Sequence, residues 1–584
     1  MKRRLSTTGQ RALVAAMKEC NIEYFFYVEG GMATLFPEIS RAGINTILCR
    51  NEKAACSMAD GYSRVARKPS VCYAQHGAAA AILSSLLYEP MFAHSPVVAL
   101  TGSTPTMEKD QWRYQEVYEK PYFEPTCKFN VDVTDAERLA DYFRIASQIA
   151  VSGCPGPTHV GMHNDMATKQ IEMDEVVGDP VFFTVPPFRP RPEPNRIAEA
   201  CKLLFEAERP VMVCGSGVHI SSAYDEVKEL AELMSIPVAT NYSGKGCFPE
   251  NHPLSLGVIG VYGRESANRI VREADVVFFV STRAGSHMTD EFTAPGPGGC
   301  KVIHLDIDPV VIGRIYKVDV PLVGDTKVTL QEMLSYSRSL FARKKSRNEY
   351  LNQISKLVGE YEKFVTKLMS DDKVPIKPQR LMEEVSKAVC ETDIIVSDTG
   401  QMVSWTTRLL KVKRAGLNYL CCSGSLGSSL PLALGASFAA ANNKGGGREQ
   451  QRILNLIGDG GVVYNIADLE TALRYNDRHA PFVVVVNNNS TLGSSRGKVA
   501  DKGNPRGWVE GFDFLDLDYA RVAESFGCFG IRVERPSEIA EAIRAAFDSG
   551  KPSVVDVATD KTEYAPIGPS RMSSEVAFPS LLSY

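Results

Sequence analysis

Short apolar runs rich in β-branched and aromatic residues recur through the chain and constrain its fold most strongly. Ten of them have the length of a strand, and segments of helical period separate them. Strands that are apolar on both faces are typical of parallel sheets covered by helices. The alternation therefore predicts an α/β fold of doubly wound parallel sheets. The runs are YFFYV (24–28), NTILC (45–49), SVCYA (70–74), PVVAL (96–100), PVMVC (210–214), DVVFFV (275–280), KVIHLDI (301–307), DIIVSD (393–398), ILNLIG (453–458) and FVVVVN (482–487).

Two segments interrupt this alternation and divide the 584 residues into three parts. VPPFRPRPEPN (185–195) holds five prolines and is predicted to be an extended connector. The segment 337–378 is charged, has helical period and ends in a proline-containing restart. The predicted domains are an N-terminal domain (1–184), a central domain (196–340), a C-terminal domain (374–565) and a Pro- and Ser-rich tail (566–584). That tail would be a peripheral wrap, a lid or a mobile end.

Composition excludes several classes of protein. The net charge is −4 and no long basic run occurs, so we expect no nucleic-acid partner. No apolar run reaches 18 residues, so we expect no membrane-spanning helix. The N-terminus is predicted to be an amphipathic helix with a capping box from Thr7 to Gln10, not a signal peptide. The 14 cysteines lack the spacing of a disulfide framework or a zinc site, which favours a cytoplasmic protein.

Two predicted strands end in polar residues. NLIGDGGVVYN places Asp459 between Gly458 and Gly460, and about thirty residues later VVVVNNNSTLG ends its strand in asparagines, including Asn489. Neighbouring strands would bring the carboxylate and the amide together, and such oxygen ligands suit Mg²⁺. The glycines would let a phosphate approach the backbone, and a helix from about Val462 would offer it free N–H groups. The alternative is a tight turn that merely requires glycine.

This combination resembles the thiamine diphosphate-dependent enzymes, in the branch of acetolactate synthase and pyruvate oxidase, over nearly the whole chain. The resemblance implies three α/β domains in the order pyrimidine-binding, central and diphosphate-binding, with thiamine diphosphate and Mg²⁺ as cofactors. The metal ligands would be the side chains of Asp459 and Asn489 and the backbone carbonyl of Thr491. Asn489 is preferred to Asn488 because its spacing to the following Leu-Gly pair matches the family pattern.

Two further segments of the C-terminal domain resemble the family. In SDTGQMVSW, Gly400 and Gln401 would contact the diphosphate. In CCSGSLGSSLPLALGA, the carbonyl of Gly424 would accept a hydrogen bond from the 4′-amino group of the cofactor. Leu426 would wedge between the two rings and force a V shape. Without the resemblance, Leu426 would be interpreted as an ordinary core residue.

The segment LCRNEKAACSMADGYSR (48–64) is predicted to be a strand end followed by a helix that begins near Glu52. By itself, a carboxylate there indicates a favourable interaction with the helix dipole. The segment resembles the family motif Glu-x-x-Ala-x-x-Met-Ala-Asp-Gly-Tyr-x-Arg, which implies that Glu52 hydrogen-bonds N1′ of the aminopyrimidine and relays a proton. In the family, Glu52 and Asp459 would come from different subunits. This implies a homodimer at least, commonly a homotetramer.

Four features would face a small-molecule substrate, and the first is YVEGGM (27–32), which resembles a Gly-Gly loop beside the thiazolium ring. His76 in AQHGAAAA departs from the family pattern and is either a proton shuttle or a hydrogen-bonded structural residue. Gln115 in RYQEV matches a family glutamine near the substrate. The segment 494–498 carries Ser494, Ser495, Arg496 and Lys498 where acetolactate synthases have an apolar pair and a tryptophan. These polar residues indicate a polar or anionic substrate, unless Arg496 and Lys498 point to solvent.

The resemblance implies an enzyme that cleaves or forms a C–C bond next to a carbonyl. We expect a 2-oxo acid decarboxylase or carboligase, similar to acetolactate synthase. The alternative is a non-decarboxylating lyase or hydrolase of a 2-hydroxyacyl or diketone compound. A non-catalytic cofactor-binding regulatory protein is a further hypothesis, and the intact Glu52 argues against it. Some relatives bind FAD or ADP in the central domain, but the segment 280–292 lacks the arginine-rich run of the flavin-binding synthases.

Overall fold

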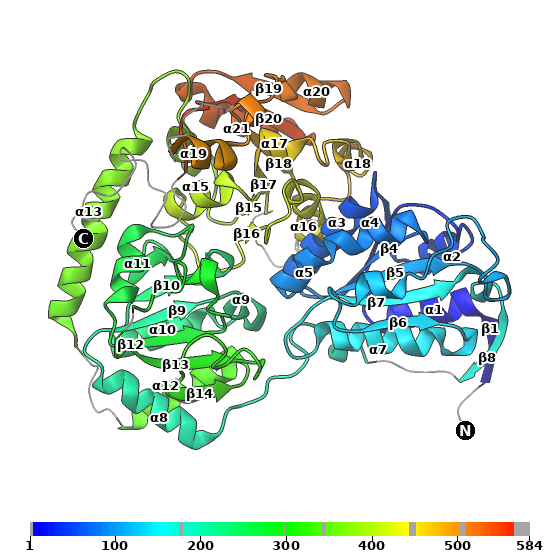
Figure 1. Cartoon of the computed structure of the whole chain (residues 1–584), viewed down its shortest axis with the longest axis horizontal. Coiled ribbons are helices and arrows are strands. Elements are labelled where there is room, and N and C mark those ends of the chain that lie inside the picture. Colours follow the sequence, from blue (N-terminus) through cyan, green and yellow to red (C-terminus); the bar gives the residue numbers. More distant parts are fainter. Residues whose placement is uncertain are drawn as a thin grey trace. The chain divides into compact units, whose positions relative to one another are not determined.

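The computed structural model describes residues 4–174, 179–296, 298–340, 346–442, 451–501 and 510–565 (Figure 1). Three six-stranded sheets and a two-stranded sheet make up its β structure. The chain divides into two compact units, each assembled from segments distant in sequence. Unit 1 comprises Met1–Phe188, Cys422–Ile453 and Tyr464–Phe482, and unit 2 comprises Arg189–Cys421, Leu454–Val463 and Val483–Tyr584. The tail over 566–584, with its predicted role as wrap or lid, lies outside the described residues.

Unit 1 is built on six parallel strands in the order β3-β2-β4-β5-β7-β6. The four apolar runs predicted in this part of the chain all form strands of this sheet. The strands are β2 (Tyr24–Tyr27), β3 (Asn45–Leu48), β4 (Ser70–Ala74), β5 (Val97–Ser103), β6 (Asn130–Val133) and β7 (Thr158–His163). The helices are α1 (Gly9–Glu19), α2 (Leu35–Arg41), α3 (Glu52–Ala66), α4 (Ala78–Leu86), α5 (Tyr88–Ala93), α6 (Lys120–Phe123), α7 (Leu139–Val151), α16 (Ser429–Asn442) and α18 (Asp468–Arg474).

The described chain begins with a strand, so the predicted capping box is wrong. β1 (Arg4–Thr8) pairs antiparallel with β8 (Gln170–Asp174), and α1 starts only at Gly9. Thr8 is the N-cap, and its side chain makes no capping hydrogen bond. The pairing partner of β1 lies far along the chain, so the local pattern of the N-terminus could not reveal it.

In unit 1 the backbones of α3 and α16 are in direct contact, and Figure 1 shows the two helices side by side. A Cβ atom at Gly61 would lie 1.9 Å from the carbonyl oxygen of Leu432. A Cβ atom at Gly435 would lie 2.0 Å from a carbonyl oxygen of α3. Only glycine permits so close an approach at these two positions. The crossing therefore fixes the helix that carries Glu52.

The first sheet of unit 2 has the order β11-β10-β9-β12-β13-β14 and is parallel throughout. The predicted connector forms neither helix nor strand from Val185 to Glu193, and α8 begins at Pro194, since proline is favoured in the first turn of a helix. The strands are β9 (Pro210–Cys214), β10 (Val238–Thr240), β11 (Ser255–Val258), β12 (Val276–Val280), β13 (Lys301–Asp306) and β14 (Val320–Val323). The helices are α8 (Pro194–Glu206), α9 (Gly217–Ser221), α10 (Tyr224–Met234), α11 (Glu265–Arg272) and α12 (Thr326–Leu340).

The glycines after β9 are explained by packing within the protein. A Cβ atom at Gly215 would lie 2.3 Å from the carbonyl oxygen of Ser281, and one at Gly217 would lie 2.3 Å from the Cβ of Ser281. A Cβ atom at Gly244 would lie 2.6 Å from the carbonyl oxygen of Cys214. The space beside these glycines is therefore filled by the chain itself, so they give no support to FAD or ADP in the central domain.

The second sheet of unit 2 has the order β16-β15-β17-β18-β20-β19, and the remaining three predicted runs form β15, β17 and β18. Its strands are β15 (Ile394–Ser397), β16 (Tyr419–Cys421), β17 (Ile453–Gly458), β18 (Phe482–Asn488), β19 (Phe529–Val533) and β20 (Ser553–Ala558). Its helices are α14 (Pro378–Ala388), α15 (Gln401–Leu409), α17 (Asp459–Val462), α19 (Gly493–Asp501), α20 (Tyr519–Ser525) and α21 (Ile539–Asp548).

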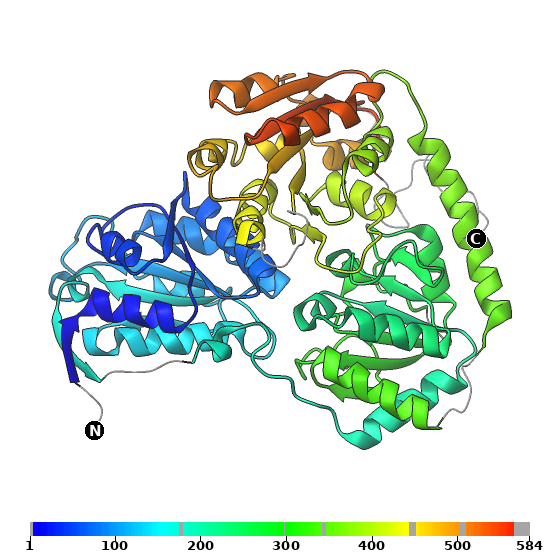
Figure 2. The ribbon, with the colours of Figure 1, turned by 180° about the vertical axis from the view of Figure 1, so that it is seen from behind.

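The charged segment predicted as a helical linker contains α13 (Asn348–Met369), the long helix at the edge of unit 2 in Figures 1 and 2. It packs against α11 and α14. Tyr361 and Val365 on its inner face are buried. The segment therefore packs as part of unit 2 and also links the two sheets of this unit along the chain.

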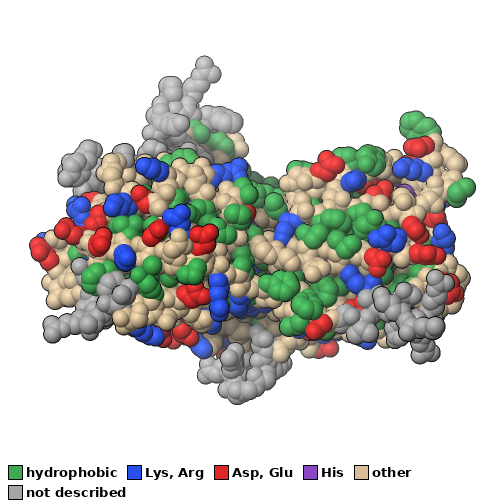
Figure 3. Space-filling view, turned by 90° about the horizontal axis from the view of Figure 1, so that it is seen from below, with side chains coloured by type: hydrophobic (Ala, Val, Ile, Leu, Met, Phe, Trp, Pro, Cys, Tyr) green, Lys and Arg blue, Asp and Glu red, His purple; other side chains and the backbone are tan. Residues whose placement is uncertain are grey.

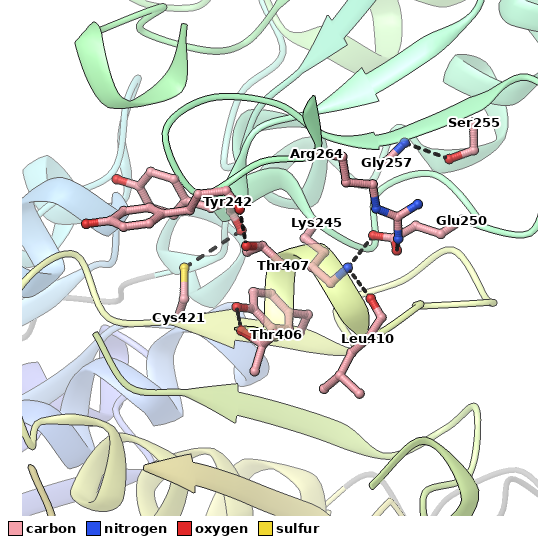
Figure 4. Close-up of polar contacts among 12 residues, drawn as sticks. Tyr242, Lys245, Glu250, Ser255, Gly257, Arg264, Thr406, Thr407, Leu410 and Cys421 are labelled. Atoms are coloured by element: carbon pink, nitrogen blue, oxygen red, sulfur yellow. Dashed lines mark hydrogen bonds and ion pairs between the residues drawn. The ribbon is translucent and has the colours of Figure 1, made fainter. Parts of the chain in front are cut away.

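A buried ionic cluster within unit 2 lies between its two sheets (Figure 4). Lys245 is fully buried and forms an ion pair with Glu250 at 2.5 Å, and Arg264 approaches the same carboxylate at 3.3 Å. Burial lowers the pKa of Lys245 to about 8, whereas Glu250 acts to raise it. The Lys245 ammonium also donates to the carbonyl oxygen of Leu410 at 2.7 Å. Since Leu410 follows α15, the cluster holds the carboxyl end of the helix whose first residue is Gln401.

Basic and acidic side chains are interspersed on the face shown in Figure 3, without a continuous basic stripe over its described residues. Among the described residues, no helix has both the length and the apolar character needed to cross a membrane.

Candidate active site

The Gly-Asp-Gly segment lies at the carboxyl end of β17, and β18 is its neighbour in the sheet. Asp459 is only 3% exposed, and its Oδ1 accepts a hydrogen bond from the backbone N–H of Gly460 at 2.9 Å. Burial raises the pKa of Asp459 to about 7, against the lowering effect of backbone N–H groups at Gly460, Thr491 and Ser490. The structure therefore places the carboxylate beside the segment that follows β18, as the spacing predicted.

The end of β18 supplies two further oxygen groups. Asn489 is buried, and its Oδ1 accepts from the N–H of Thr491 at 3.3 Å. Thr491 is also buried and donates from its hydroxyl to the carbonyl oxygen of Phe512 at 3.0 Å. Asn488 instead donates inward to Asp556, at 3.0 Å, which agrees with the choice of Asn489 as the candidate ligand.

This set of oxygens fits a divalent cation. The groups that act to lower the pKa of Asp459 are backbone N–H groups, so a bound cation would offset the cost of burying the carboxylate. Among the described residues, no group of three or more His, Cys, Asp or Glu side chains could hold a metal. A metal at this position would therefore use one carboxylate with amide and backbone oxygens and water, as Mg²⁺ does.

The helix expected to begin at about Val462 ends there instead. α17 spans Asp459–Val462, and the next helix, α18, starts only at Asp468. A single turn does not provide the helix N-terminus that we predicted for phosphate binding. The two glycines also differ, since a Cβ atom at Gly458 would meet nothing within 4 Å, whereas one at Gly460 would lie 2.9 Å from Leu492 Cδ2. Gly458 leaves room for a ligand, whereas a side chain at Gly460 would press against Leu492.

The predicted diphosphate residues lie at the end of β15, in the same unit as Asp459. Gly400 has a φ of +76°, which a glycine adopts without strain, and Gln401 begins α15. Oε1 of Gln401 is buried and has no hydrogen-bond partner among the described residues. A Cβ atom at Gly493 would lie 2.7 Å from this oxygen. Gln401 thus lies against the segment that follows Thr491, which brings the two predicted groups of cofactor residues together.

Glu52 is the first residue of α3, as predicted, and is half-buried in unit 1. The side chain of Asn51 caps the helix by accepting from the N–H of Ala54 at 2.9 Å. Later in the same helix, Arg64 forms an ion pair with the fully buried Asp60. The Asn51 cap holds the amino end of α3, and the ion pair and the crossing with α16 hold the later part of the helix.

The loop between β16 and α16 carries Gly424 and Leu426. The buried carboxylate of Glu89 binds the backbone of this loop. Glu89 of α5 accepts hydrogen bonds from the N–H groups of Ser423 and Ser425, both at 2.6 Å. Burial raises the pKa of Glu89, and these two N–H groups lower it. Leu426 is half-buried, so it is not an ordinary core residue. Sequence reasoning missed Glu89, because nothing near it in the sequence indicates partners so far along the chain.

His76 and Gln115 lie in adjoining loops of unit 1. Nε2 of His76 is 2.9 Å from the carbonyl oxygen of Tyr114. Nδ1 of His76 and Oε1 of Gln115 are buried and have no hydrogen-bond partner among the described residues. Leaving such atoms unpaired costs roughly 1–3 kcal/mol each, so both are candidates to bind a ligand. The hydrogen bond of His76 to the backbone also supports the structural interpretation of this residue.

The segment 494–498 lies in α19. Oγ of Ser494 is buried without a partner among the described residues and lies 3.8 Å from the position of a Cβ atom at Gly400. Arg496 does not point freely to solvent, since it binds Asp513 at 3.0 Å and the hydroxyl of Tyr564 at 2.5 Å. The side chain of Lys498 lies outside the described residues.

The candidate residues fall into two groups. Unit 2 brings together Gly400, Gln401, Gly458, Asp459, Gly460, Asn489 and Thr491. Unit 1 holds Glu52, His76, Gln115, Gly424 and Leu426.

Comparison with known proteins identifies the family. Residues 7–121 match the thiamine pyrophosphate enzyme N-terminal TPP binding domain, residues 197–333 the central domain of these enzymes, and residues 398–557 their C-terminal TPP binding domain. Thiamine pyrophosphate is another name for thiamine diphosphate. The three matches cover more than half of the chain.

Relatives of known name align over nearly the full length. A probable acetolactate synthase large subunit of Methanocaldococcus jannaschii is 32% identical over 96% of this chain and 93% of its own. The acetolactate synthase large subunit of Corynebacterium glutamicum is 28% identical over 94% and 86%. The glyoxylate carboligase of Escherichia coli O157:H7 is 28% identical over 92% and 90%. The chain therefore belongs to the thiamine diphosphate-dependent enzymes, in the acetolactate synthase branch.

Proposed function

We propose that this enzyme uses thiamine diphosphate and Mg²⁺ to act as a decarboxylase or carboligase on a small or polar 2-oxo acid. The proposed substrate class rests on two buried atoms without hydrogen-bond partners among the described residues, which are His76 Nδ1 and Gln115 Oε1. A substrate with only a methyl group beside its carbonyl would leave both atoms buried and unpaired, whereas a polar substrate would satisfy them. The relatives named acetolactate synthase and glyoxylate carboligase support the reaction class.

The residues of unit 2 would hold the cofactor. When bound, thiamine diphosphate supplies an electron sink for cleavage of the bond next to a carbonyl. Asp459, Asn489 and the carbonyl of Thr491 would bind Mg²⁺, and Gly400 and Gln401 would bind the diphosphate. The open space beside Gly458 would admit the phosphate oxygens. Gln401 supports this role because its buried Oε1 is unpartnered and therefore free to orient on a ligand.

The residues of unit 1 would orient the reacting parts. The carboxyl of Glu52 would hold and return a proton at N1′ of the aminopyrimidine, as general acid-base catalysis requires. The carbonyl of Gly424 would accept from the 4′-amino group, and Leu426 would support the bend of the cofactor. Glu89 fixes the backbone on both sides of Gly424. Nδ1 of His76 and Oε1 of Gln115 would accept hydrogen bonds from a hydroxyl group of the substrate and so position it.

A substrate panel tests the proposed reaction. We expect 2-oxo acids with a hydroxyl-bearing substituent to release CO₂ and to be used with at least about a tenfold higher kcat/KM than pyruvate, because one matched polar contact is worth about that factor. CO₂ release and the ligated or aldehyde product would be measured with the metal-loaded enzyme. Turnover of a 2-hydroxyacyl thioester or a diketone without CO₂ would instead support a non-decarboxylating lyase or hydrolase.

We also propose a homodimer at least, with Glu52 of one subunit and Asp459 of the partner subunit in each active site. In that case, mixing Glu52→Gln chains with Asp459→Ala chains should restore activity. Random pairing would give about one quarter of the wild-type rate, since half of the dimers are mixed and each mixed dimer holds one intact site. Rates after refolding of the mixed chains, with each variant alone as control, measure this effect. No recovery would show that both residues act from one chain.

The names of the Methanocaldococcus and Corynebacterium relatives include the words large subunit. We propose a second kind of subunit as a partner of this chain on that basis. Co-purification from the native cell, followed by identification of the bound chain, tests this proposal.

A further inference from the structure

The buried carboxylate of Glu119 is tied to the loop that carries His76. Glu119 is 6% exposed and immediately precedes α6. Its Oε1 accepts a hydrogen bond from the backbone N–H of Gly77, the residue between His76 and α4. A charged acceptor makes this bond stronger than a neutral one would. The bond connects the loop after β4 with the segment that ends at Glu119.

The same two segments meet at two more points. Nε2 of His76 lies 2.9 Å from the carbonyl oxygen of Tyr114. Gly77 has a φ of +70°, and a Cβ atom there would lie 2.6 Å from the carbonyl oxygen of Gln115. Gln115 itself has a φ of +60°, a conformation that costs free energy for a residue with a side chain. Neighbouring contacts must therefore hold this backbone in place.

The contacts between these two segments also fix the positions of two side-chain atoms that lack hydrogen-bond partners among the described residues. Nδ1 of His76 and Oε1 of Gln115 are buried without partners among the described residues. Neither of these two atoms makes a hydrogen bond that would orient its side chain, and Nε2 of His76 bonds only to the backbone of Tyr114. Their placement depends instead on the backbone to which they are attached, and Glu119 binds that backbone at Gly77.

A cavity of about 380 Å³ opens on the other side of Glu119. The 109–120 segment contributes Lys109, Asp110, Glu116 and Lys120 to its wall, and β6 and β7 contribute Asp132, His159 and His163. Nε2 of His163 lies 3.5 Å from Asp132 and has no hydrogen-bond partner among the described residues. The cavity gives Glu119 a polar surrounding through which it can exchange protons.

The charges around the cavity act on Glu119 in opposite directions. Burial raises the pKa of Glu119 to about 7, the N–H of Gly77 lowers it, and the negative charge of Asp132 raises it. His163 and the hydroxyl of Thr101 also lower it. On β4, burial raises the pKa of the Tyr73 hydroxyl, and the negative charges of Glu29 and Glu119 raise it further. Tyr73 therefore stays neutral where Glu119 titrates.

We propose that Glu119 is a positioning residue that holds His76 and Gln115 in the geometry required for substrate binding, and that its ionised form does so best. This inference rests on the proposed roles of His76 and Gln115. Glu119 would touch neither the substrate nor the cofactor, because Glu119 acts through the backbone of Gly77.

The expected effect of pH on kcat/KM follows from the protonation of Glu119, which accepts the hydrogen bond from Gly77. As the pH falls through about 7, Glu119 gains a proton and its oxygen becomes a weaker acceptor for the N–H of Gly77. The loop is then held less firmly, so kcat/KM should fall on the acid side of pH 7. Glutamine keeps a neutral acceptor oxygen at every pH, and leucine keeps none.

Two variants separate these effects. We expect Glu119→Leu to lower kcat/KM by about tenfold or more, because the charge-assisted hydrogen bond is lost. Glu119→Gln should retain more activity than Glu119→Leu and should lose the inflection near pH 7. In the cofactor-free protein, amide hydrogen exchange in residues 74–81 should be about tenfold faster in Glu119→Leu than in wild type. Glu124→Gln and Glu124→Leu, at an exposed glutamate beyond the other end of α6, are the matched controls.

A double-mutant cycle tests whether Glu119 acts through His76. Glu119→Leu should add little to the loss caused by His76→Ala. Fully additive losses, or unchanged amide exchange in Glu119→Leu, would overturn the inference. The exchange measurement needs neither cofactor nor substrate, so it decides on Glu119 even if the proposed substrates are not turned over. If His76→Ala and Gln115→Ala leave turnover unchanged, the proposed function of these two residues fails instead, and with it the role assigned to Glu119.

Discussion

Replacing Asp459 by alanine is expected to abolish Mg²⁺-dependent binding of thiamine diphosphate. The carboxylate is the one charged group in the proposed metal site, and its neighbours Asn489 and Thr491 offer only neutral oxygens. Without it, the divalent cation and the diphosphate would lose the negative ligand that orients them on the protein. We expect the affinity for the cofactor in the presence of Mg²⁺ to fall by at least about a thousandfold, as for removal of a buried charged partner.

Isothermal calorimetry with and without Mg²⁺ measures this loss. Asp477→Ala, which changes an exposed aspartate after α18, is the matched control and should bind the cofactor normally. Thermal unfolding of the cofactor-free variants checks that Asp459→Ala still folds. Wild-type affinity in Asp459→Ala would reject the assignment of the metal site, and so would a loss that is equal with and without Mg²⁺.

Replacing Glu52 by glutamine is expected to leave most of the cofactor affinity and to remove most of the turnover. Glutamine has nearly the same shape at the start of α3 and can still hydrogen-bond N1′, but it cannot give up and recover a proton. General acid-base groups contribute about 10²–10⁴-fold to enzymatic rates, and we expect a loss of kcat in that range. The affinity for the cofactor should change by less than about tenfold, because the hydrogen bond is retained in neutral form.

Exchange of the cofactor C2 proton with deuterated water, followed by NMR after acid quenching, reports on this step without any substrate. It should slow in Glu52→Gln as much as turnover does. The control is Glu137→Gln, which changes an exposed glutamate in the same unit. Full activity in Glu52→Gln would falsify the proton-relay role and leave Glu52 as a helix-capping charge.

Ten of the twenty strands among the described residues were predicted, because each of these ten is encoded by a short apolar run of adjacent residues. All ten apolar runs form strands, since burial on both faces selects β-branched and aromatic residues along the whole strand. β1 could not be predicted, because its stability comes from pairing with β8 far along the chain. The helix after Asp459 was also placed wrongly, because the apolar residues from Val462 onward gave no sign that the helix ends after one turn.

In the candidate site, too, residues with a local sequence pattern were predicted, whereas residues that depend on distant partners were not. Asp459 and Asn489 were found from a strand-end pattern and a spacing, and the neighbouring positions of β17 and β18 bring them together. Arg496 was predicted to face the substrate or the solvent from its charge alone, but Asp513 and Tyr564 bind it. Glu89 and Glu119 were not recognised, because their partners are backbone N–H groups of distant loops, and any residue can supply such a group.

The sequence by itself determined the α/β class, ten of the strands among the described residues, the family and the residue types that a thiamine cofactor requires. These depend on local patterns of burial and on fixed spacings within a few segments. Only the tertiary structure decided which buried carboxylates fix the loops around Gly424 and His76, and which predicted polar residues are occupied by partners within the protein. Those properties depend on side chains and backbone groups that meet only after folding, and the free energy of burying a charge depends on what surrounds it.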